Sequence, residues 1–222
     1  MIVLGLDPSL TNFGWALYDS TATGKARCPA RGRFKTKSSE LFVSRFMSLR
    51  QSLIDLVEKY NPDKIGVESV VFHSSYSEGM YALFVYVNEA LFSLHKDVLY
   101  LAPSQVKSFS RPIGAFPEGW KMDKPEMVKC AKEHTGGVGK WNHNEADAYL
   151  IAVMASRFWL LKDGLIQEDD LSSLEEELFT KKHTFSRGKK KGVTEYRGLI
   201  YKKNDRYYEW SKEIEDGKEK KK

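Results

Sequence analysis

The sequence predicts an α/β domain with a mixed five-stranded sheet flanked by helices, followed by a basic C-terminal extension. Three observations lead to this prediction. Short apolar runs of strand length are separated by longer segments in which apolar residues recur every three or four positions. Acidic residues stand at the ends of two of these runs, and positive charge is concentrated near the C-terminus. We therefore assign residues 1–164 to the α/β domain and residues 165–222 to the extension.

The first part of the chain has the pattern of a sheet. Residues 2–6 are apolar throughout, as in a strand that is buried on both faces, and a short turn leads to a second run that would pair with them. Residues 19–31 contain glycine, proline and small polar residues, which indicates a loop. We expect five strands in all, at residues 2–6, 13–18, 32–36, 64–68 and 98–101.

Helices are expected after the third strand and between the later ones. Apolar residues from Phe42 onward recur at spacings of four and three, with Ser38 or Ser39 as the N-cap and Asn61-Pro62 as the stop. Three strands and a helix are thus followed by alternating strands and helices. We expect helices at about residues 42–60, 76–95, 104–110, 124–134 and 144–162, with a loop at 111–122.

The last quarter of the chain has an uneven charge pattern. Residues 168–180 carry six acidic and no basic side chains, and residues 181–222 carry 15 Lys or Arg against seven acidic residues. We expect an acidic, helical connector at 165–180 and a hairpin at 197–210 that turns at Lys203-Asn204-Asp205. A basic arm is typical of proteins that bind a polyanion, and a solvated tail is the alternative.

Composition excludes several classes of protein. An apolar content of 41% is enough to build a core, and no run approaches the ~20 apolar residues of a membrane helix. Asp7 comes too early, without preceding basic residues, for a secretory signal. Cys28 and Cys130 are far apart and lack the spacing of zinc ligands, which favours reduced thiols. We therefore expect a protein that is neither membrane-bound nor secreted, in a reducing compartment such as the cytoplasm.

Three carboxylates lie where they contribute little to stability. Asp7 ends the first apolar strand, Glu68 ends the run Ile65-Gly66-Val67, and Asp147 lies on the inner face of the last apolar helix. Each alone is compatible with a turn or a surface position. Together, clustered like charges repel unless a cation neutralises them, and carboxylate oxygens suit Mg²⁺ or Mn²⁺. Two such ions about 3.5–4 Å apart support phosphodiester hydrolysis, so the pattern predicts a metal-dependent hydrolase.

Four segments resemble the motifs of one family, in the same order. They are Leu4–Gly14 around Asp7, Glu68-Ser69-Val70-Val71-Phe72, Ala102–Lys107 and Glu145–Ala152. These segments resemble the motifs of the RuvC-type Holliday junction resolvases of the RNase H-like superfamily, over about residues 1–160. The resemblance implies an RNase H-like nuclease domain. It also implies an endonuclease that resolves four-way DNA junctions by paired symmetric nicks, leaving 5′-phosphate and 3′-hydroxyl ends.

The resemblance also implies a cofactor and partners. The cofactor would be Mg²⁺, two ions per site, with Mn²⁺ as a substitute, and the substrate branched DNA in a nucleoid, a virus-infected cell or an organelle. A homodimer is implied because a symmetric junction needs two identical sites. The helix from Tyr81 to Leu94 is apolar on more than one side, so one side would cover the sheet and the other form the dimer. The C-terminal extension is the alternative cover for that second side.

Further catalytic residues follow from the same resemblance. The family places a fourth metal ligand about one helical turn before the last Asp, and His143 and Asn144 both meet this spacing. We favour His143, as a metal ligand or a group that transfers protons, with Asn144 as the alternative. Lys107 and Lys124 resemble lysines that stabilise charge building on the scissile phosphate. For both lysines an ordinary position on a helix surface is the alternative.

Candidate DNA contacts lie in two places. Phe72 resembles an aromatic residue that stacks on bases opened at the junction centre, and His73 follows in a polar loop suited to phosphate contacts. A Phe packed in the core is the alternative for Phe72. The basic arm contributes further candidates for DNA binding, namely Lys189, Lys190 and Lys191.

Three other functions stay open from the sequence. A nuclease of the same fold would cut flaps, other branched DNA or RNA–DNA hybrids, as RNase H does. Sugar kinases and actin-like ATPases share the fold, but they need a longer chain and a second phosphate loop, for which Gly136-Gly137-Val138-Gly139 is too isolated. A junction-binding module without catalysis is the third, and the intact Asp7, Glu68 and Asp147 argue against it.

Overall fold

The structure of the protein is a computed structural model, which describes residues 1–69, 78–137, 139–184, 186–188, 192–196, 198–203 and 206–209. The chain divides into two compact units, Met1–Ser156 and Arg157–Lys222, and the division falls within helix α5 (His143–Lys162). The domain boundary expected after residue 164 stays a prediction.

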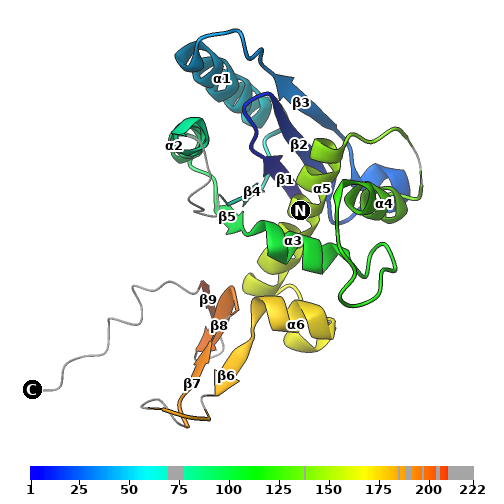
Figure 1. Cartoon of the computed structure of the whole chain (residues 1–222). Helices are drawn as coiled ribbons and strands as arrows, with labels where there is room; N and C mark the ends of the chain where they lie inside the picture. Colours follow the sequence, from blue (N-terminus) through cyan, green and yellow to red (C-terminus); the bar gives the residue numbers. More distant parts are fainter. Residues whose placement is uncertain are drawn as a thin grey trace, which may run out of the picture. The chain divides into compact units, whose positions relative to one another are not determined.

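The first unit is built on a mixed five-stranded sheet in the order β3-β2-β1-β4-β5 (Figure 1). β1 pairs antiparallel with β2, which pairs antiparallel with β3, whereas β1, β4 and β5 are parallel neighbours. This confirms the predicted fold class, and each predicted strand end lies within one residue of the observed one. The strands are β1 (Ile2–Asp7), β2 (Asn12–Asp19), β3 (Arg31–Lys35), β4 (Lys64–Glu68) and β5 (Val98–Leu101).

Helix α5 crosses one face of the sheet at close range because the strands beneath it carry glycine. A Cβ atom at Gly5 of β1 would lie 1.9 Å from the carbonyl oxygen of Ala148. One at Gly14 of β2 would lie 2.2 Å from the carbonyl oxygen of Asn144. Side chains at these two positions would push the helix off the sheet. The glycines therefore set the first two turns of α5 directly over β1 and β2.

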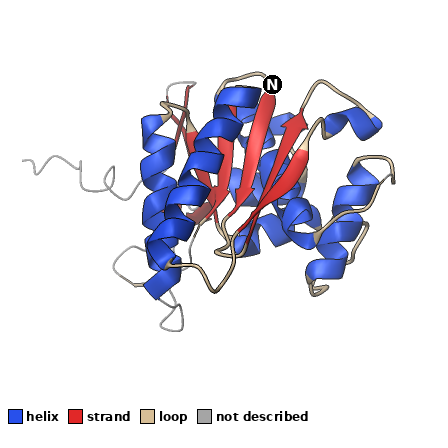
Figure 2. Ribbon diagram, turned by 90° about the horizontal axis from the view of Figure 1, so that it is seen from above, coloured by secondary structure: helices blue, strands red, loops and turns tan. Residues whose placement is uncertain are grey.

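Helices α1 (Phe42–Tyr60) and α2 (Glu78–Ser93) belong to a core on the opposite face, and Figure 2 shows helices on both sides of the sheet. The predicted helical stripes supply the contacts, because residues three and four apart share one face of a helix. The buried cluster includes Leu4, Leu6 and Phe13 from the sheet, Phe46, Leu49 and Leu53 from α1, and Leu83, Val87 and Leu91 from α2.

The predicted N-cap of α1 was wrong. Ser38 and Ser39 lie in a turn, in which the backbone N–H of Glu40 donates to the carbonyl of Lys37 at 3.1 Å. The N-cap is Leu41, which has no side-chain capping bond. In this turn the carboxylate of Glu40 accepts a hydrogen bond from the N–H of Lys37, and packing of Phe46 and later apolar residues sets where the helix lies.

The remaining elements of the first unit connect the sheet to α5. A 3₁₀ turn, Gly24–Arg27, interrupts the predicted loop at 19–31. Helix α3 (Pro103–Ser110) follows β5, and α4 (Lys124–His134) precedes α5, as expected. The segment between α3 and α4 has no regular secondary structure, in agreement with the predicted loop. Within the described ranges, none of the helices has the length and hydropathy needed to cross a membrane.

The second unit begins with the end of α5. Arg157 forms an ion pair with Glu175 at 2.6 Å and donates to the carbonyl of Asp170 at 3.0 Å, so the acidic connector is ordered beside its own helix. The predicted helical character is confirmed by a 3₁₀ turn, Glu168–Asp170, and by α6 (Ser173–Phe179). The predicted hairpin is confirmed by β8 (Ile200–Lys203) pairing with β9 (Arg206–Glu209). A second antiparallel pair, β6 (Lys182–Thr184) and β7 (Thr194–Tyr196), was not predicted.

Candidate active site

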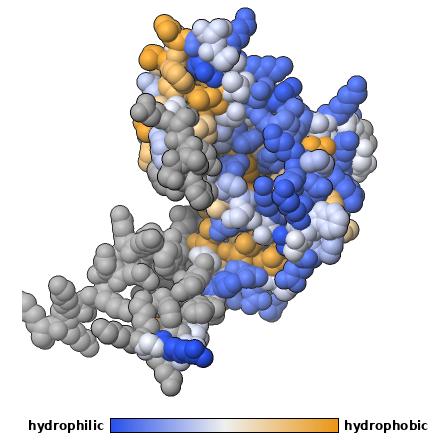
Figure 3. Space-filling view, viewed as in Figure 1, coloured by the Kyte–Doolittle hydropathy of each residue, from blue (hydrophilic) through white to orange (hydrophobic). Residues whose placement is uncertain are grey.

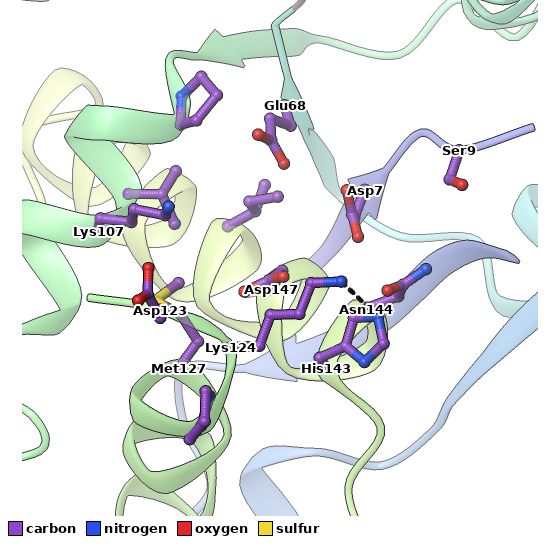
Figure 4. Close-up of a pocket in the computed structure, with 14 residues that line it drawn as sticks. Asp7, Ser9, Glu68, Lys107, Asp123, Lys124, Met127, His143, Asn144 and Asp147 are labelled. Carbon is purple, nitrogen blue, oxygen red and sulfur yellow. Dashed lines mark hydrogen bonds between the residues drawn. The ribbon is translucent and has the colours of Figure 1, made fainter. Parts of the chain in front are cut away.

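The three predicted carboxylates line one cavity of about 630 Å³ (Figure 4). Asp7 is the last residue of β1 and Glu68 the last residue of β4. The parallel register pairs Leu6 with Val67, so the two acids extend from neighbouring strand ends at the same level. Asp147 reaches the same cavity from α5, in the turn that the glycine contact places over β1. The sheet and the helix thus bring together residues that are 140 positions apart in the chain.

The carboxyl groups strongly affect one another's acidity. Burial, followed by repulsion from Glu68 and Asp147, raises the pKa of Asp7 well above its usual value. Burial also raises the pKa of Glu68, although its hydrogen bond with Asp7 and the nearby Lys107 oppose that shift. Burial and the charge of Glu68 raise the pKa of Asp147 to about 7. The cluster is therefore unfavourable as three free anions, and a bound cation would relieve it.

Two lysines line the same cavity as the acids, and Figure 4 shows Lys124 beside Asp147 and His143. Lys107 lies on α3 and acts electrostatically on Glu68 and Asp147, lowering the pKa of each. Lys124 is the first residue of α4 and lowers the pKa of Asp7 and Asp147. Both predicted lysines are thus present in the cavity with the three acids. An anionic phosphate would find cationic partners there as well as the carboxylates.

The two candidates for the fourth ligand differ in their surroundings. His143 is the first residue of α5, one turn before Asp147, and its Nε2 lies 3.3 Å from the Nζ of Lys124. Partial burial, then Lys124 and Arg33, lower the pKa of the imidazole, which favours a neutral ring with one unprotonated nitrogen. Asn144 is buried, and its Nδ2 donates to the carbonyl of Asn12, which ties α5 to β2.

Glu145, the third residue of α5, does not join the site. Its carboxylate pairs with Arg31 and Arg33 of β3, each at 3.3 Å. These pairs hold the first turn of α5 against the edge strand of the sheet. The charge of Glu145 is thereby compensated by two cations outside the cavity.

The cavity has lining residues that the sequence analysis did not single out. They include Ser9, which follows β1, and Asp123 and Met127 at the start of α4. Asp123 carried a usable signal, because an Asp followed three residues later by Glu is typical of a helix start. The structure bears this out, since the N–H of Asp123 donates to the carboxylate of Glu126 at 3.1 Å. That pattern marks the helix but does not reveal that its first turn faces the carboxylates.

Several predicted DNA contacts lie outside the described residues. These are Phe72 and His73 in the segment after β4, and Lys189, Lys190 and Lys191 in the basic arm. Their roles stay predictions. The reduced thiols are consistent with the structure, in which Cys28 and Cys130 are both free.

The donor set fits a hard divalent cation, because it combines carboxylate oxygens with one imidazole. Among the residues that the structure describes, no three His, Cys, Asp or Glu side chains are already arranged to hold an ion. The carboxylates would therefore have to move together around it, exchanging a shared proton for the metal. The raised pKa values of Asp7 and Asp147 favour protonated carboxyl groups when no cation is near.

Comparison with known proteins identifies relatives for this architecture. The family model described as crossover junction endodeoxyribonuclease RuvC matches residues 3–115, which is 113 of 222 residues. The RuvC of Rickettsia felis is 27% identical over 156 residues, covering 68% of this chain and 95% of that protein. The RuvC of Orientia tsutsugamushi is 26% identical over 160 residues, covering 70% and 95%.

Solved structures agree with these sequence matches at the level of the fold. Thermus thermophilus RuvC superposes with a TM-score of 0.56 and 22% identity, covering 69% of this chain and 92% of that protein. The T. thermophilus RuvC solved in complex with a Holliday junction substrate gives a TM-score of 0.54 over a similar extent. The matched portion is comparable in length to the first unit, which holds the sheet, the first part of α5 and the cavity.

Proposed function

Because this chain belongs to the RuvC family of crossover junction endodeoxyribonucleases, we propose that its cavity resolves four-way DNA junctions. Each site cuts one phosphodiester, and two symmetry-related nicks leave 5′-phosphate and 3′-hydroxyl ends. The observation that carries the proposal is the meeting of Asp7, Glu68 and Asp147 with two lysines in one cavity. Acids alone would repel a phosphate, and lysines alone would bind it without activating water.

The family depends on a divalent metal, and we infer Mg²⁺, two ions per site, with Mn²⁺ as a substitute. Asp7, Glu68, Asp147 and His143 would hold the ions. When bound, the ions activate water and stabilise charge on the attacked and leaving oxygens. The neutral imidazole of His143 and the engaged side-chain amide of Asn144 favour His143 as the fourth ligand.

The chain's own cations have separate roles in this proposal. Lys107 and Lys124 bind the non-bridging oxygens of the scissile phosphate and stabilise the charge that builds on them. Lys124 also lies beside His143, so a phosphate that draws Lys124 forward would free the imidazole for the metal or for a proton. Ser9 lies at the end of the cavity near Asp7. In this proposal its hydroxyl donates a hydrogen bond to the DNA strand that carries the scissile phosphate.

A homodimer would supply two such sites, and an apolar surface supports it. Figure 3 shows apolar side chains gathered over α1 and α2. We call this surface the α1–α2 patch. It comprises Phe42, Val43, Met47, Val85 and Phe92, each more than half exposed. Apolar patches of this kind are typical of protein interfaces. A two-fold contact through α2 would present identical sites to a symmetric junction. Such a protein would act in a reducing compartment that contains DNA, such as the cytoplasm.

The proposal is tested by incubating the full chain with a synthetic four-way junction, a matched duplex, a flap and an RNA–DNA hybrid. Each substrate is assayed with Mg²⁺, with Mn²⁺ and with a chelator. We expect paired nicks at symmetric positions in the junction, sealed by ligase, and no cutting with chelator. Preferential cutting of the flap or the hybrid would reject junction resolution and leave a nuclease of the same fold. Tight junction binding without any cutting would reject catalysis.

A further inference from the structure

The connection between α3 and α4, residues 111–123, joins two helices that line the cavity, and its last residue, Asp123, lines the cavity itself. We call it the α3–α4 loop. It leaves α3 shortly after Lys107 and enters α4 at Lys124, so it joins the two helices that bring lysines to the site. Figure 1 shows it standing out from the body of the first unit beside α4. The end of the loop that precedes Lys124 therefore borders any nucleic-acid strand bound in the cavity.

The α3–α4 loop has a defined shape although it forms no helix or strand. The N–H of Phe116 donates to the carbonyl of Arg111 at 3.1 Å. Lys129 of α4 donates to the carbonyl of Gly114 at 3.2 Å, and its Nζ lies 4.5 Å from the centre of the Phe116 ring. Met122 at the far end is buried. Lys129 thus holds Gly114 and Phe116 of the loop against α4.

Trp120 is an exposed aromatic residue on this loop, with 49% of its surface accessible to solvent. Its ring lies against Phe116, with centroids 6.1 Å apart and planes inclined by 23°. A turn places it there, in which the N–H of Trp120 donates to the carbonyl of Pro117 at 3.1 Å. Gly119 has φ +78° in that turn, a conformation that glycine adopts without strain. The indole is therefore held on one side and open to solvent on the other.

The position of Trp120 relative to the cavity limits what it can touch. Trp120 lies four positions before Lys124, and an extended chain spans at most ~3.6 Å per residue, so the two Cα atoms lie within about 14 Å. Successive phosphates of one strand are about 3.4 Å apart along a duplex. Trp120 therefore reaches nucleotides only a few steps from a phosphate held by Lys124.

We propose that Trp120 stacks on an unpaired base a few nucleotides from the phosphate being cut. This inference rests on the proposed function, since it takes a branched nucleic acid as the ligand. An indole offers a flat apolar face and no positive charge, so it suits a base that has lost its stacking neighbour and not the phosphate backbone. Bases at a branch point have such an open face. Phe116 behind the ring fixes its orientation, so little side-chain freedom is lost on binding.

The test compares three variants of the full chain, each combined with Asp7→Asn so that binding is measured without cleavage. Trp120→Ala removes the ring, Trp120→Phe keeps an aromatic face, and Lys121→Ala truncates a neighbour on the same loop whose side chain is more exposed than that of Trp120. The probe is a four-way junction with 2-aminopurine at successive positions around the nick. Thermal melting of each variant checks that it folds, as expected for substitutions of exposed side chains.

With Trp120 present, we expect the fluorescence of 2-aminopurine to change at one or two positions near the nick. Trp120→Ala should abolish this change and weaken binding about tenfold, with no change in the salt dependence of affinity, because the uncharged indole neutralises no phosphate. Trp120→Phe should restore most of both effects, and Lys121→Ala should leave the fluorescence change intact. The inference is overturned if Trp120→Ala binds as tightly as its parent with the same fluorescence.

The same experiment separates this inference from the proposed function. The substrate panel of the wild-type chain is run in parallel, and the 2-aminopurine series is built into whichever substrate is cut. If that substrate is a flap or a hybrid, junction resolution fails while stacking by Trp120 is still measured. If the junction is cut and Trp120→Ala behaves as its parent, stacking fails while resolution stands. A chain that binds no nucleic acid would overturn both.

Discussion

At the level of single residues, the cavity concentrates acids whose ionised forms are unfavourable without a cation. Asp7, Glu68 and Asp147 all have raised pKa values, and burial is the largest cause for each. Lys107 and Lys124 oppose the shift only in part. The site without a metal ion therefore destabilises the folded protein near neutral pH. Binding of a proton or a metal ion removes this unfavourable contribution.

Replacing Asp147 by Asn should make the metal-free protein more stable above pH 7. Its pKa is about 7 in the folded chain and near 3.8 when unfolded, so between these values the folded state holds the extra proton. Stability from this group is thus lost as pH rises towards 7. With chelator present, we expect Asp147→Asn to gain roughly 2–4 kcal/mol at pH 8 and little at pH 4.5. Denaturant unfolding at several pH values measures this.

His134 is a second group whose titration changes the stability of the folded protein with pH. Burial lowers the pKa of His134 to about 4, so protonation of this histidine destabilises the folded state as pH falls below about 6.5. Because His134 is present in both proteins, its contribution cancels in the difference between variant and wild type. A stability difference that does not depend on pH would show that Asp147 ionises normally in the folded chain.

His143 and Asn144 should respond differently to truncation. His143→Ala should keep the stability of the fold but raise the Mg²⁺ concentration needed for cleavage by about 10–100-fold, as for loss of a group that supports a metal. Asn144→Ala should cost about 1–2 kcal/mol of stability, because the carbonyl of Asn12 loses its buried donor. Metal titrations of cleavage and thermal melts of both variants distinguish these roles. The reverse pattern would assign the ligand to Asn144.

At the level of elements, the apolar pattern predicted the sheet closely but left its details undetermined. Continuous runs such as residues 2–6 are strong signals because both faces of the strand are buried. The β6–β7 pair was missed because three-residue strands such as Lys182-His183-Thr184 have no apolar alternation to detect. The three carboxylates were predicted because the pattern of apolar residues indicates where a strand ends and which residues share one face of a helix. The engagement of Asn144 with Asn12 depends on how closely α5 approaches β2, which local sequence does not encode.

The α1–α2 patch should be the surface through which two copies associate. Phe92 is 79% exposed on α2, so Phe92→Glu places a charge on the patch without disturbing the core. We expect dissociation to a monomer at micromolar concentration and loss of paired nicks, with single nicks retained. Leu165→Glu is the matched control, since Leu165 is also an exposed large apolar residue but lies outside the patch. Light scattering coupled to gel filtration gives the mass, and a wild-type monomer would contradict the assignment.

At the level of the whole molecule, charge is separated along the chain. The net charge of +5 hides an acidic segment before a strongly basic arm. Changing Lys189, Lys190 and Lys191 together to Gln should weaken junction binding most at low salt. The slope of log affinity against log salt should fall by about 0.9 for each phosphate that the arm no longer neutralises, up to about 2.7. An unchanged slope in a filter-binding series would make the arm a solvated tail.

The most direct test of paired cleavage uses a supercoiled plasmid that extrudes a cruciform. Two coordinated nicks across the four-way junction linearise the circle, whereas one nick relaxes it to an open circle. With Mg²⁺, we predict linear DNA with ligatable ends as the main product, and Asp7→Asn should bind the cruciform yet cut at least about a thousandfold more slowly. Open circles as the main product would contradict paired cleavage. Full activity in Asp7→Asn would contradict catalysis by the carboxylate site.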